Sequence, residues 1–177
     1  TGFPTERVIG QAGVLDSARM AHFIALELGC AEEDVSPMVL GGHGDTMVPL
    51  PKYTTVGGIP LTQLMSEETI AAISDRTAKG GGEIVKLLER GSAFYAPGSA
   101  AAIMAESVLN DRKRVIPASC HLSGEYGLEN IYIGVPCIIG ANGVEKIFEL
   151  ELTESEMESL HGSANFYKSQ LVDILGY

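Results

Sequence analysis

One helical segment constrains the fold of this chain more than any other feature of its sequence. Residues 15–28 are apolar on nearly every side of a helix, and Gly29 ends the run. A helix with apolar residues all round is normally buried, because no face of it prefers water. We therefore expect residues 15–28 to form a buried helix that other elements must cover.

The middle of the chain predicts short strands at residues 38–40 and 53–56 and helices at residues 66–88 and 99–109. Ser66 can cap the first of these helices, with acidic residues in its first turn. Three glycines at residues 80–82 lie inside that helix, and each costs about 1 kcal/mol relative to alanine. Either the helix breaks there, or another group approaches its backbone closely.

The last third predicts strands at residues 114–122, 131–139 and 144–152, followed by an amphipathic helix. Asn142-Gly143 is typical of a type I′ hairpin turn, and Thr153 with Glu156 forms a capping box. The apolar stripe of the last helix consists of Met157, Leu160, Ala164, Tyr167, Leu171 and Ile174. Because hairpins occur without βαβ alternation, we expect an α+β fold with an antiparallel sheet and packed helices.

Charge and length exclude several classes of protein. The 177 residues are enough for one domain, and 12 Lys and Arg against 23 Asp and Glu give a net charge of −11. We expect no nucleic-acid or anionic-membrane partner, since either needs a basic surface. No apolar run reaches the roughly 18 residues of a membrane span. Cys30, Cys120 and Cys137 are widely spaced, which indicates free thiols and a cytoplasmic location.

Asp16 and Arg19 form the first group with chemical potential. They are three residues apart, so they share one face of an otherwise apolar helix. Buried charges are costly unless they are paired. One interpretation is a structural salt bridge or a helix end that reaches water. The other is a ligand cavity in which the planar fork of Arg19 binds a carboxylate.

His43 forms the second group, within the segment Gly41-Gly42-His43-Gly44-Asp45-Thr46. Glycines on both sides let the backbone lie close to a ligand, and histidine is suited to proton transfer near neutral pH. The alternative is a glycine-rich turn with an incidental histidine. His43 and Asp45 alone are not a metal ligand set, and we expect no metal.

These residues resemble the lactate/malate dehydrogenase family in their order and spacing. The segments that carry the resemblance are Val14-Leu15-Asp16-Ser17-Ala18-Arg19, Leu40-Gly41-Gly42-His43-Gly44-Asp45-Thr46-Met47-Val48-Pro49 and Gly91-Ser92-Ala93-Phe94-Tyr95. The resemblance implies that His43 is the proton acceptor and donor and that Asp16 is its partner. It also implies that Arg19 binds the substrate carboxylate and that Ser92 and Ala93 contact the substrate.

The resemblance implies reversible oxidation of malate to oxaloacetate with NAD, and hence a small dicarboxylate as substrate. Gly42, Thr46-Met47 and Ala93 look like the bacterial malate type rather than the lactate type. Members of the family are homodimers or homotetramers, and a homo-oligomer is expected here.

The resemblance covers only the second half of such a protein. No G-x-G-x-x-G or G-x-x-x-x-G-K-[ST] motif is present, so nothing in this sequence cradles a pyrophosphate. We expect residues 1–177 to be the substrate-binding and catalytic domain of a longer two-domain chain. The Rossmann domain and the main cofactor site would then lie outside this sequence, and the isolated 177 residues would be inactive.

Three other hypotheses stay open at this point. The first is a lactate dehydrogenase or another 2-hydroxy-acid dehydrogenase. The second is a non-catalytic domain for dicarboxylate binding or oligomerisation. The third is a metal-dependent hydrolase that uses His43, Asp45 and Asp16.

Overall fold

The computed structural model describes the backbone of residues 2–175 and the side chains of residues 2–172. Its helices are α1 (Gly13–Leu28), α2 (Glu67–Leu88), α3 (Tyr95–Leu109) and α4 (Glu154–Leu175). Its strands are β1 (Gly10–Gln11), β2 (Val35–Ser36), β3 (Val39–Gly41), β4 (Met47–Pro49), β5 (Thr55–Val56), β6 (Ile59–Pro60), β7 (Arg114–Ser123), β8 (Glu129–Gly140) and β9 (Gly143–Ile147).

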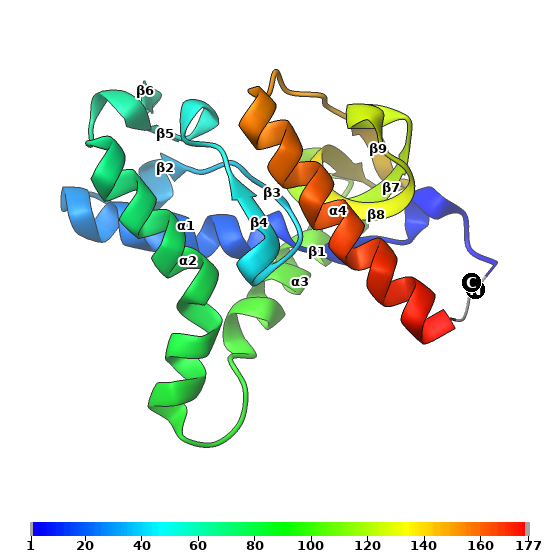
Figure 1. Ribbon diagram of the computed structural model, residues 1–177, viewed down its shortest axis with the longest axis horizontal. Coiled ribbons are helices and arrows are strands. Elements are labelled where there is room, and N and C mark those ends of the chain that lie inside the picture. The colour runs from blue at the N-terminus through cyan, green and yellow to red at the C-terminus, as the bar shows by residue number, and fades with distance from the viewer. Residues whose placement is uncertain (1, 176–177) are drawn as a thin grey trace.

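The strands form two antiparallel sheets. The larger sheet has the order β1-β7-β8-β3-β4, with β9 paired on β8, and the smaller has the order β2-β5-β6. The long β7–β8 pair extends from Arg114 opposite Ile139 to Ser123 opposite Glu129. Figure 1 shows α1 passing behind the other elements, with α2 and α4 on either side of β3 and β4. The expected α+β class with an antiparallel sheet is confirmed.

Helix α1 connects two separate apolar cores. Its first turn packs into a core with β7 and β8 through Val14 and Leu15. Further along, Met20 and Ile24 belong to a second core that includes residues of the smaller sheet and α2. The expected burial is therefore confirmed for most of α1, including Ile24 near its end. It is wrong for one side of the helix, where Ala18 and His22 are exposed and Leu26 is 62% exposed, because the two cores do not cover this side.

Helix α2 runs unbroken through its three glycines. Ser66 caps it as predicted, and its hydroxyl oxygen accepts a hydrogen bond from the Thr69 amide. Helix α3 starts at Tyr95, four residues earlier than predicted. The predicted strand at residues 53–56 is shorter than expected, since Tyr53 belongs to a 3₁₀ turn.

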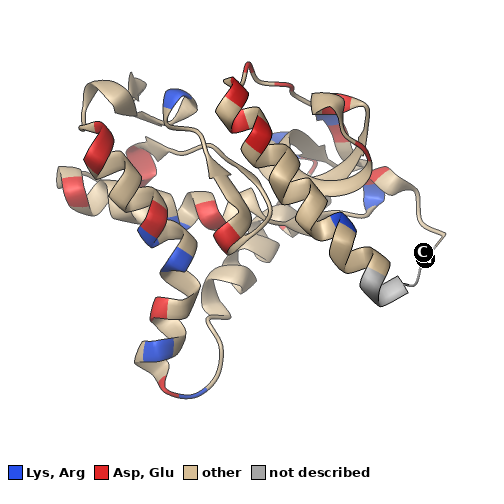
Figure 2. Cartoon of the chain, in the orientation of Figure 1, with Lys and Arg blue, Asp and Glu red and all other residues tan. Residues whose placement is uncertain are grey.

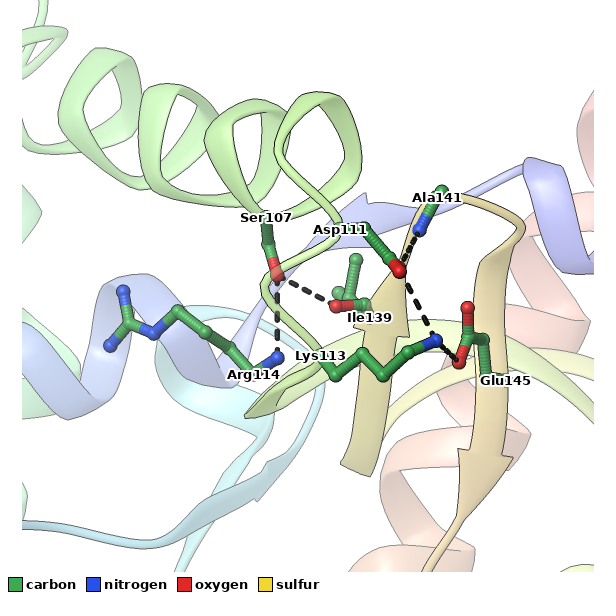
Figure 3. A network of polar contacts seen from close by, with 7 residues as sticks. All are labelled: Ser107, Asp111, Lys113, Arg114, Ile139, Ala141 and Glu145. Carbon is green, nitrogen blue, oxygen red and sulfur yellow. Dashed lines mark hydrogen bonds and ion pairs between the residues drawn. The ribbon is translucent and has the colours of Figure 1, made fainter.

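The β8–β9 hairpin is confirmed, but its turn is not of type I′. A type I′ turn needs positive φ at both central residues, whereas here positive φ occurs at Gly143 and not at Ala141 or Asn142. A Cβ on Gly143 would collide with the Glu6 carbonyl oxygen. Asp111 fixes the turn from outside, because its Oδ1 accepts a hydrogen bond from Ala141 N at 2.9 Å (Figure 3).

The returning strand predicted at residues 144–152 ends at Ile147. Phe148 N still donates to Pro136 O of β8 at 2.8 Å, and after this bond the buried Tyr126 side chain is the hydrogen-bond partner of the backbone in place of a neighbouring strand. The Tyr126 hydroxyl donates to the Phe148 carbonyl at 2.8 Å and accepts from Leu150 N at 2.9 Å. Burial raises the pKa of Tyr126 to about 12, so the hydroxyl keeps its proton for this role.

Helix α4 begins with the predicted capping box. Thr153 Oγ1 accepts from Glu156 N, and Glu156 Oε2 accepts from Thr153 N. Leu160 and Ala164 of the predicted stripe are fully buried, and Met157 and Tyr167 are half-buried. Leu171 is 45% exposed, so the stripe leaves the core before it reaches this residue. The Ile174 side chain lies outside the described residues.

Within residues 2–175, no helix combines the length and the apolar character that a membrane crossing requires.

Removing the charge of Asp111 should destabilise the fold at neutral pH and matter less in acid. The hydrogen bond from Ala141 N, followed by the contact with Lys113, holds the pKa of Asp111 below its ordinary value of 3.8. Such a carboxyl group stabilises the fold above its unfolded pKa, and this contribution is lost as the pH falls through its folded pKa. Urea unfolding of the chain and of Asp111→Asn, measured from neutral to acidic pH, should show a difference that shrinks toward acid.

Glu106→Gln is the matched control, since the Glu106 side chain forms an exposed ion pair with Arg112 but, among the described residues, accepts no hydrogen bond from a backbone amide. A difference for Asp111→Asn that stays constant with pH, or that equals the control, would contradict this account.

Candidate active site

The loop that carries His43 joins two paired strands of the large sheet. β3 and β4 pair in register from Val39 opposite Pro49 to Gly41 opposite Met47, and η3 (Gly44–Thr46) lies between them. Gly41 has a φ of 83°, a conformation that a residue with a side chain rarely adopts. The glycines therefore allow a tight connection that presents His43 at its tip.

His43 contacts Asp16 of α1, as the resemblance implied. His43 Nδ1 lies 2.9 Å from Asp16 Oδ1. The Asp16 side chain is fully buried, whereas 43% of the His43 side chain is exposed. A carboxylate can only accept hydrogen bonds, so Nδ1 carries the proton, and Nε2 is left with a free lone pair in the neutral ring.

Arg19 does not form the structural salt bridge with Asp16 that was one of the two interpretations. Among the described residues no ion pair joins them, and Arg19 Nε is buried without a hydrogen-bond partner. A Cβ on Gly81 would lie 3.3 Å from Arg19 Nη2, and one on Gly80 would lie 3.3 Å from Arg19 Cδ. The glycines inside α2 thus allow its backbone to lie against the arginine, which is the close approach that the sequence suggested.

Arg19 and His43 border one open hollow of about 780 Å³ between α1, α2 and the β3–β4 loop. Its other lining residues are Gly44, Asp45, Ala78, Lys79, Gly81, Gly82, Glu83 and Lys86. The hollow therefore combines a proton-accepting ring with a cation at a size suited to a small molecule.

The charges around this hollow are not balanced. Lys79 is paired with Asp75 at 2.6 Å, and Glu83 is paired with Arg76 at 2.9 Å. Within the part of the chain that the structure describes, Arg19 and Lys86 take part in no ion pair. Figure 2 shows basic and acidic residues interspersed along α2. Asp45, which also lines the hollow, takes part in no ion pair among the described residues either. The two unpaired cations outnumber this one unpaired carboxylate, so the hollow is suited to an anion.

Ser92 and Ala93 do not join this group. Both lie in the connection between α2 and α3, Ser92 exposed and Ala93 half-buried, and neither lines the hollow. Figure 1 shows this connection at the far end of α2, away from the sheets. Because α2 continues as one helix to Leu88, it carries the following residues away from His43. Their contact with substrate stays a prediction.

None of the three cysteines lines the hollow that His43 borders. Cys30, Cys120 and Cys137 are free thiols, as expected. Cys120 and Cys137 are buried, and the hydrogen bond between them and burial raise the pKa of Cys120. His121 packs against Tyr132 on the opposite face of the strand from Cys120.

The metal hypothesis finds no ligand set here. No three His, Cys, Asp or Glu side chains among the described residues come close enough together to hold a metal ion.

Sequence reasoning missed the residues of α4 that touch the His43 loop. Ser163 Oγ accepts a hydrogen bond from Gly42 N, and Tyr167 packs against Gly42. Tyr167 was expected only as part of an apolar stripe. Lys86, which lines the hollow, was also missed. Gly42 and Ser163 are 121 positions apart, and a contact over such a separation cannot be predicted from the local pattern of one sequence.

Known proteins match this chain over almost its whole length. Residues 13–175 match the lactate/malate dehydrogenase, alpha/beta C-terminal domain family. The chain is 56% identical over 171 residues to a malate dehydrogenase from Roseiflexus sp. (strain RS-1), covering 97% of this chain and 55% of the relative. It is also 56% identical over 168 residues to a malate dehydrogenase from Methanosarcina acetivorans, covering 95% and 55%. The chain thus spans about half the length of the curated relatives it matches.

Solved structures share the fold. The 1.55 Å structure of malate dehydrogenase from Salinibacter ruber matches with a TM-score of 0.96 and 52% identity, covering 98% of this chain and 57% of that one. The lactate dehydrogenase from Cryptosporidium parvum, complexed with lactic acid and NAD, matches with a TM-score of 0.92 and 44% identity, covering 97% and 56%.

These matches confirm the family that the motifs around Asp16 and His43 suggested. The shared fold and the identity over nearly the whole chain show that it belongs to the lactate/malate dehydrogenase family, as an alpha/beta C-terminal domain.

Proposed function

We propose that this chain is the substrate-binding and catalytic part of an NAD-dependent malate dehydrogenase, which interconverts malate and oxaloacetate. The observation that carries the proposal is the Asp16–His43 contact, which opens into the same hollow as Arg19. In this family a proton acceptor beside a cation for a carboxylate supports oxidation of a 2-hydroxy acid.

His43 acts on the substrate hydroxyl group. Its Nδ1 is occupied by Asp16, so Nε2 is the atom that accepts the hydroxyl proton when malate is oxidised and returns it in the reverse direction. The ring becomes an imidazolium in the process. The buried Asp16 carboxylate then faces a full positive charge at 2.9 Å, and it stabilises this state more strongly than it would in water.

Arg19 binds the C1 carboxylate of the substrate. Its guanidinium presents parallel N–H groups that match both carboxylate oxygens. The backbone of α2 lies against it at Gly81 and limits its movement. A fixed carboxylate holds the hydroxyl-bearing carbon at one position relative to His43, and such orientation contributes several kcal/mol to catalysis, on the order of 7 or more in the best cases.

The glycine-rich segment around His43 does not form a cradle for the dinucleotide pyrophosphate. The glycines beside His43 lead into η3, a turn of three residues, and not into the N-terminus of a long helix. When bound, NAD supplies the hydride acceptor. We place its pyrophosphate and adenosine on residues outside this chain, in a second domain of a longer protein, and we expect the full enzyme to be a homodimer or homotetramer.

Malate is favoured over lactate as the substrate. The malate dehydrogenases from Roseiflexus and Salinibacter ruber are 56% and 52% identical to this chain, above the 44% of the lactate dehydrogenase from Cryptosporidium parvum, whereas the malate dehydrogenase from Cryptosporidium parvum is 40% identical. The preference therefore rests on the relatives that exceed 50% identity. The additional unpaired cation Lys86 at the hollow is compatible with a doubly charged substrate.

Replacing His43 should abolish turnover without unfolding the protein. A chimera that joins the N-terminal part of the Salinibacter ruber enzyme to this chain supplies the dinucleotide site. In it, His43→Gln should lower kcat for malate oxidation by roughly 10²- to 10⁴-fold, the usual contribution of acid–base catalysis. His22→Gln is the control, because His22 is an exposed histidine of α1 that pairs with Glu32. A His43→Gln chimera of near-normal activity, or a folded parent chimera that does not oxidise malate, would refute the proposal.

Replacing Arg19 by lysine should weaken binding of the substrate and of the transition state together. Lysine keeps the charge but loses the two parallel hydrogen bonds, and a hydrogen bond to a charged group is worth about 1.5–3 kcal/mol. Steady-state kinetics of the chimera should therefore show kcat/KM for malate reduced by roughly 10- to 100-fold. Arg112→Lys, at an exposed ion pair with Glu106, should leave it unchanged. Equal values for the two variants would remove Arg19 from the substrate site.

A further inference from the structure

We propose that Ser163 and Tyr167 of α4 are positioning residues that hold the His43 loop in its catalytic geometry. The inference deepens the proposed function and rests on it, because it assigns a role to residues that do not line the hollow with Arg19. Three observations support it, namely a buried hydrogen bond, a close ring contact and the flexibility that the loop would otherwise have.

The first observation is the hydrogen bond between Gly42 N and Ser163 Oγ. The amide donates to the hydroxyl oxygen at 2.9 Å, and Ser163 is only 4% exposed. A buried amide that loses its partner costs about 1–3 kcal/mol. The bond is made by the residue directly before His43, so it fixes the backbone from which the imidazole projects.

The second observation is the position of the Tyr167 ring. A Cβ on Gly42 would lie 2.5 Å from Tyr167 Oη and would collide with the ring carbon Cε2. The ring therefore covers the space that a side chain at Gly42 would fill. Its hydroxyl oxygen also lies 3.4 Å from Thr46 Oγ1, at the other end of the loop.

The third observation is the composition of the loop itself. Glycine stands on both sides of His43, and glycine has more accessible backbone conformations than any other residue. Without outside contacts, this loop would sample many conformations. Helix α4 packs against β3, β4 and η3, and α2 packs against η3 as well. Figure 1 shows the β3–β4 connection between these two helices.

Two kinds of contact together determine the position of the His43 imidazole. Asp16 fixes the ring through Nδ1, and α4 fixes the backbone to which the ring is attached. Proton transfer requires the substrate hydroxyl within about 3 Å of the accepting nitrogen, and a displacement of 1 Å can cost on the order of 10²-fold in rate. Loosening the loop should therefore lower kcat, while KM for malate, which depends on Arg19, stays close to its original value.

The test compares Ser163→Ala with Ser159→Ala in the 177-residue chain and in the chimera. Ser159 lies one turn earlier on α4, and its hydroxyl donates to Ser155 O at the exposed surface. In the chain, Ser163→Ala should accelerate hydrogen exchange of the Gly42 amide and broaden the NMR signal of the His43 Nδ1 proton. In the chimera it should lower kcat by roughly 10- to 100-fold with little change in KM. Ser159→Ala should change none of these readouts.

A second pair of variants keeps the test decisive if Ser163→Ala does not fold. Tyr167→Phe retains the ring over Gly42 and loses only the hydroxyl contact with Thr46, so it should lower kcat less than Tyr167→Leu. Tyr167→Leu removes the ring and should affect the His43 signal and kcat in the same direction as Ser163→Ala. Parent-like readouts for both Ser163→Ala and Tyr167→Leu would overturn the inference, as would a loss of stability with no separate loss of kcat.

The two proposals fail in distinguishable ways. If His43→Gln keeps its activity while Ser163→Ala still disturbs the His43 signal, the proposed function is wrong and the positioning role stands. If His43→Gln abolishes activity while the α4 variants leave kcat unchanged, the proposed function stands and the positioning role is wrong.

Discussion

The contact between Asp16 and His43 is the interaction on which the rest of the site depends. It joins a fully buried carboxylate on α1 to a histidine that is 43% exposed, so one partner lies in the interior and the other reaches the hollow. Asp16 Oδ2 is buried without a partner in the described residues. A buried charge with incomplete hydrogen bonding contributes little to stability and often reduces it. A functional reason for this arrangement is that Asp16 stabilises the protonated form of His43. Only in that form does the buried carboxylate have a full positive charge beside it.

Helix α1 can hold this aspartate in place because it belongs to two cores at once. Val14 and Leu15 anchor it against the large sheet, and Met20 and Ile24 anchor it against the second core. Asp16 and Arg19 lie one helical turn apart between these anchors. They could pair with each other, but Asp16 is taken by His43, and the backbone of α2 lies against Arg19. The packing of the two cores therefore separates two charges that the helix alone would bring together.

Much of this could be predicted from the sequence, and the failures have identifiable causes. The capping box at Thr153 follows from local chemistry, and the contact of Asp16 with His43 was implied by the resemblance to a known family. The sequence left open whether the helix breaks at residues 80–82, and the structure shows an unbroken helix that Arg19 approaches closely. The end of β9 could not be predicted, because after the hydrogen bond from Phe148 N to Pro136 O the Tyr126 hydroxyl takes the place of a neighbouring strand as the partner of the backbone. The contact of Ser163 with Gly42 could not be predicted either. The spacing of apolar residues indicates which face of a helix is buried, but it does not indicate which distant backbone amide a side chain on that face binds. The predicted type I′ turn was wrong, because the sequence around Asn142 does not show that the backbone of Glu6 packs against Gly143.

The acidic character of the chain and the cationic hollow are consistent with each other. A net charge of −11 repels polyanions, which present many phosphates over a long distance. A small dicarboxylate responds to the charges within about 8 Å, because salt screens exposed charges that are more distant. Within that range the decisive groups are those that the fold leaves unpaired. Arg76 and Lys79 are neutralised by acidic neighbours on α2, whereas Arg19 is kept from Asp16 by the contacts of α1 with His43 and α2. In the proposed function, the affinity for a small anion therefore arises from the fold, because the fold keeps the buried Arg19 from pairing with Asp16.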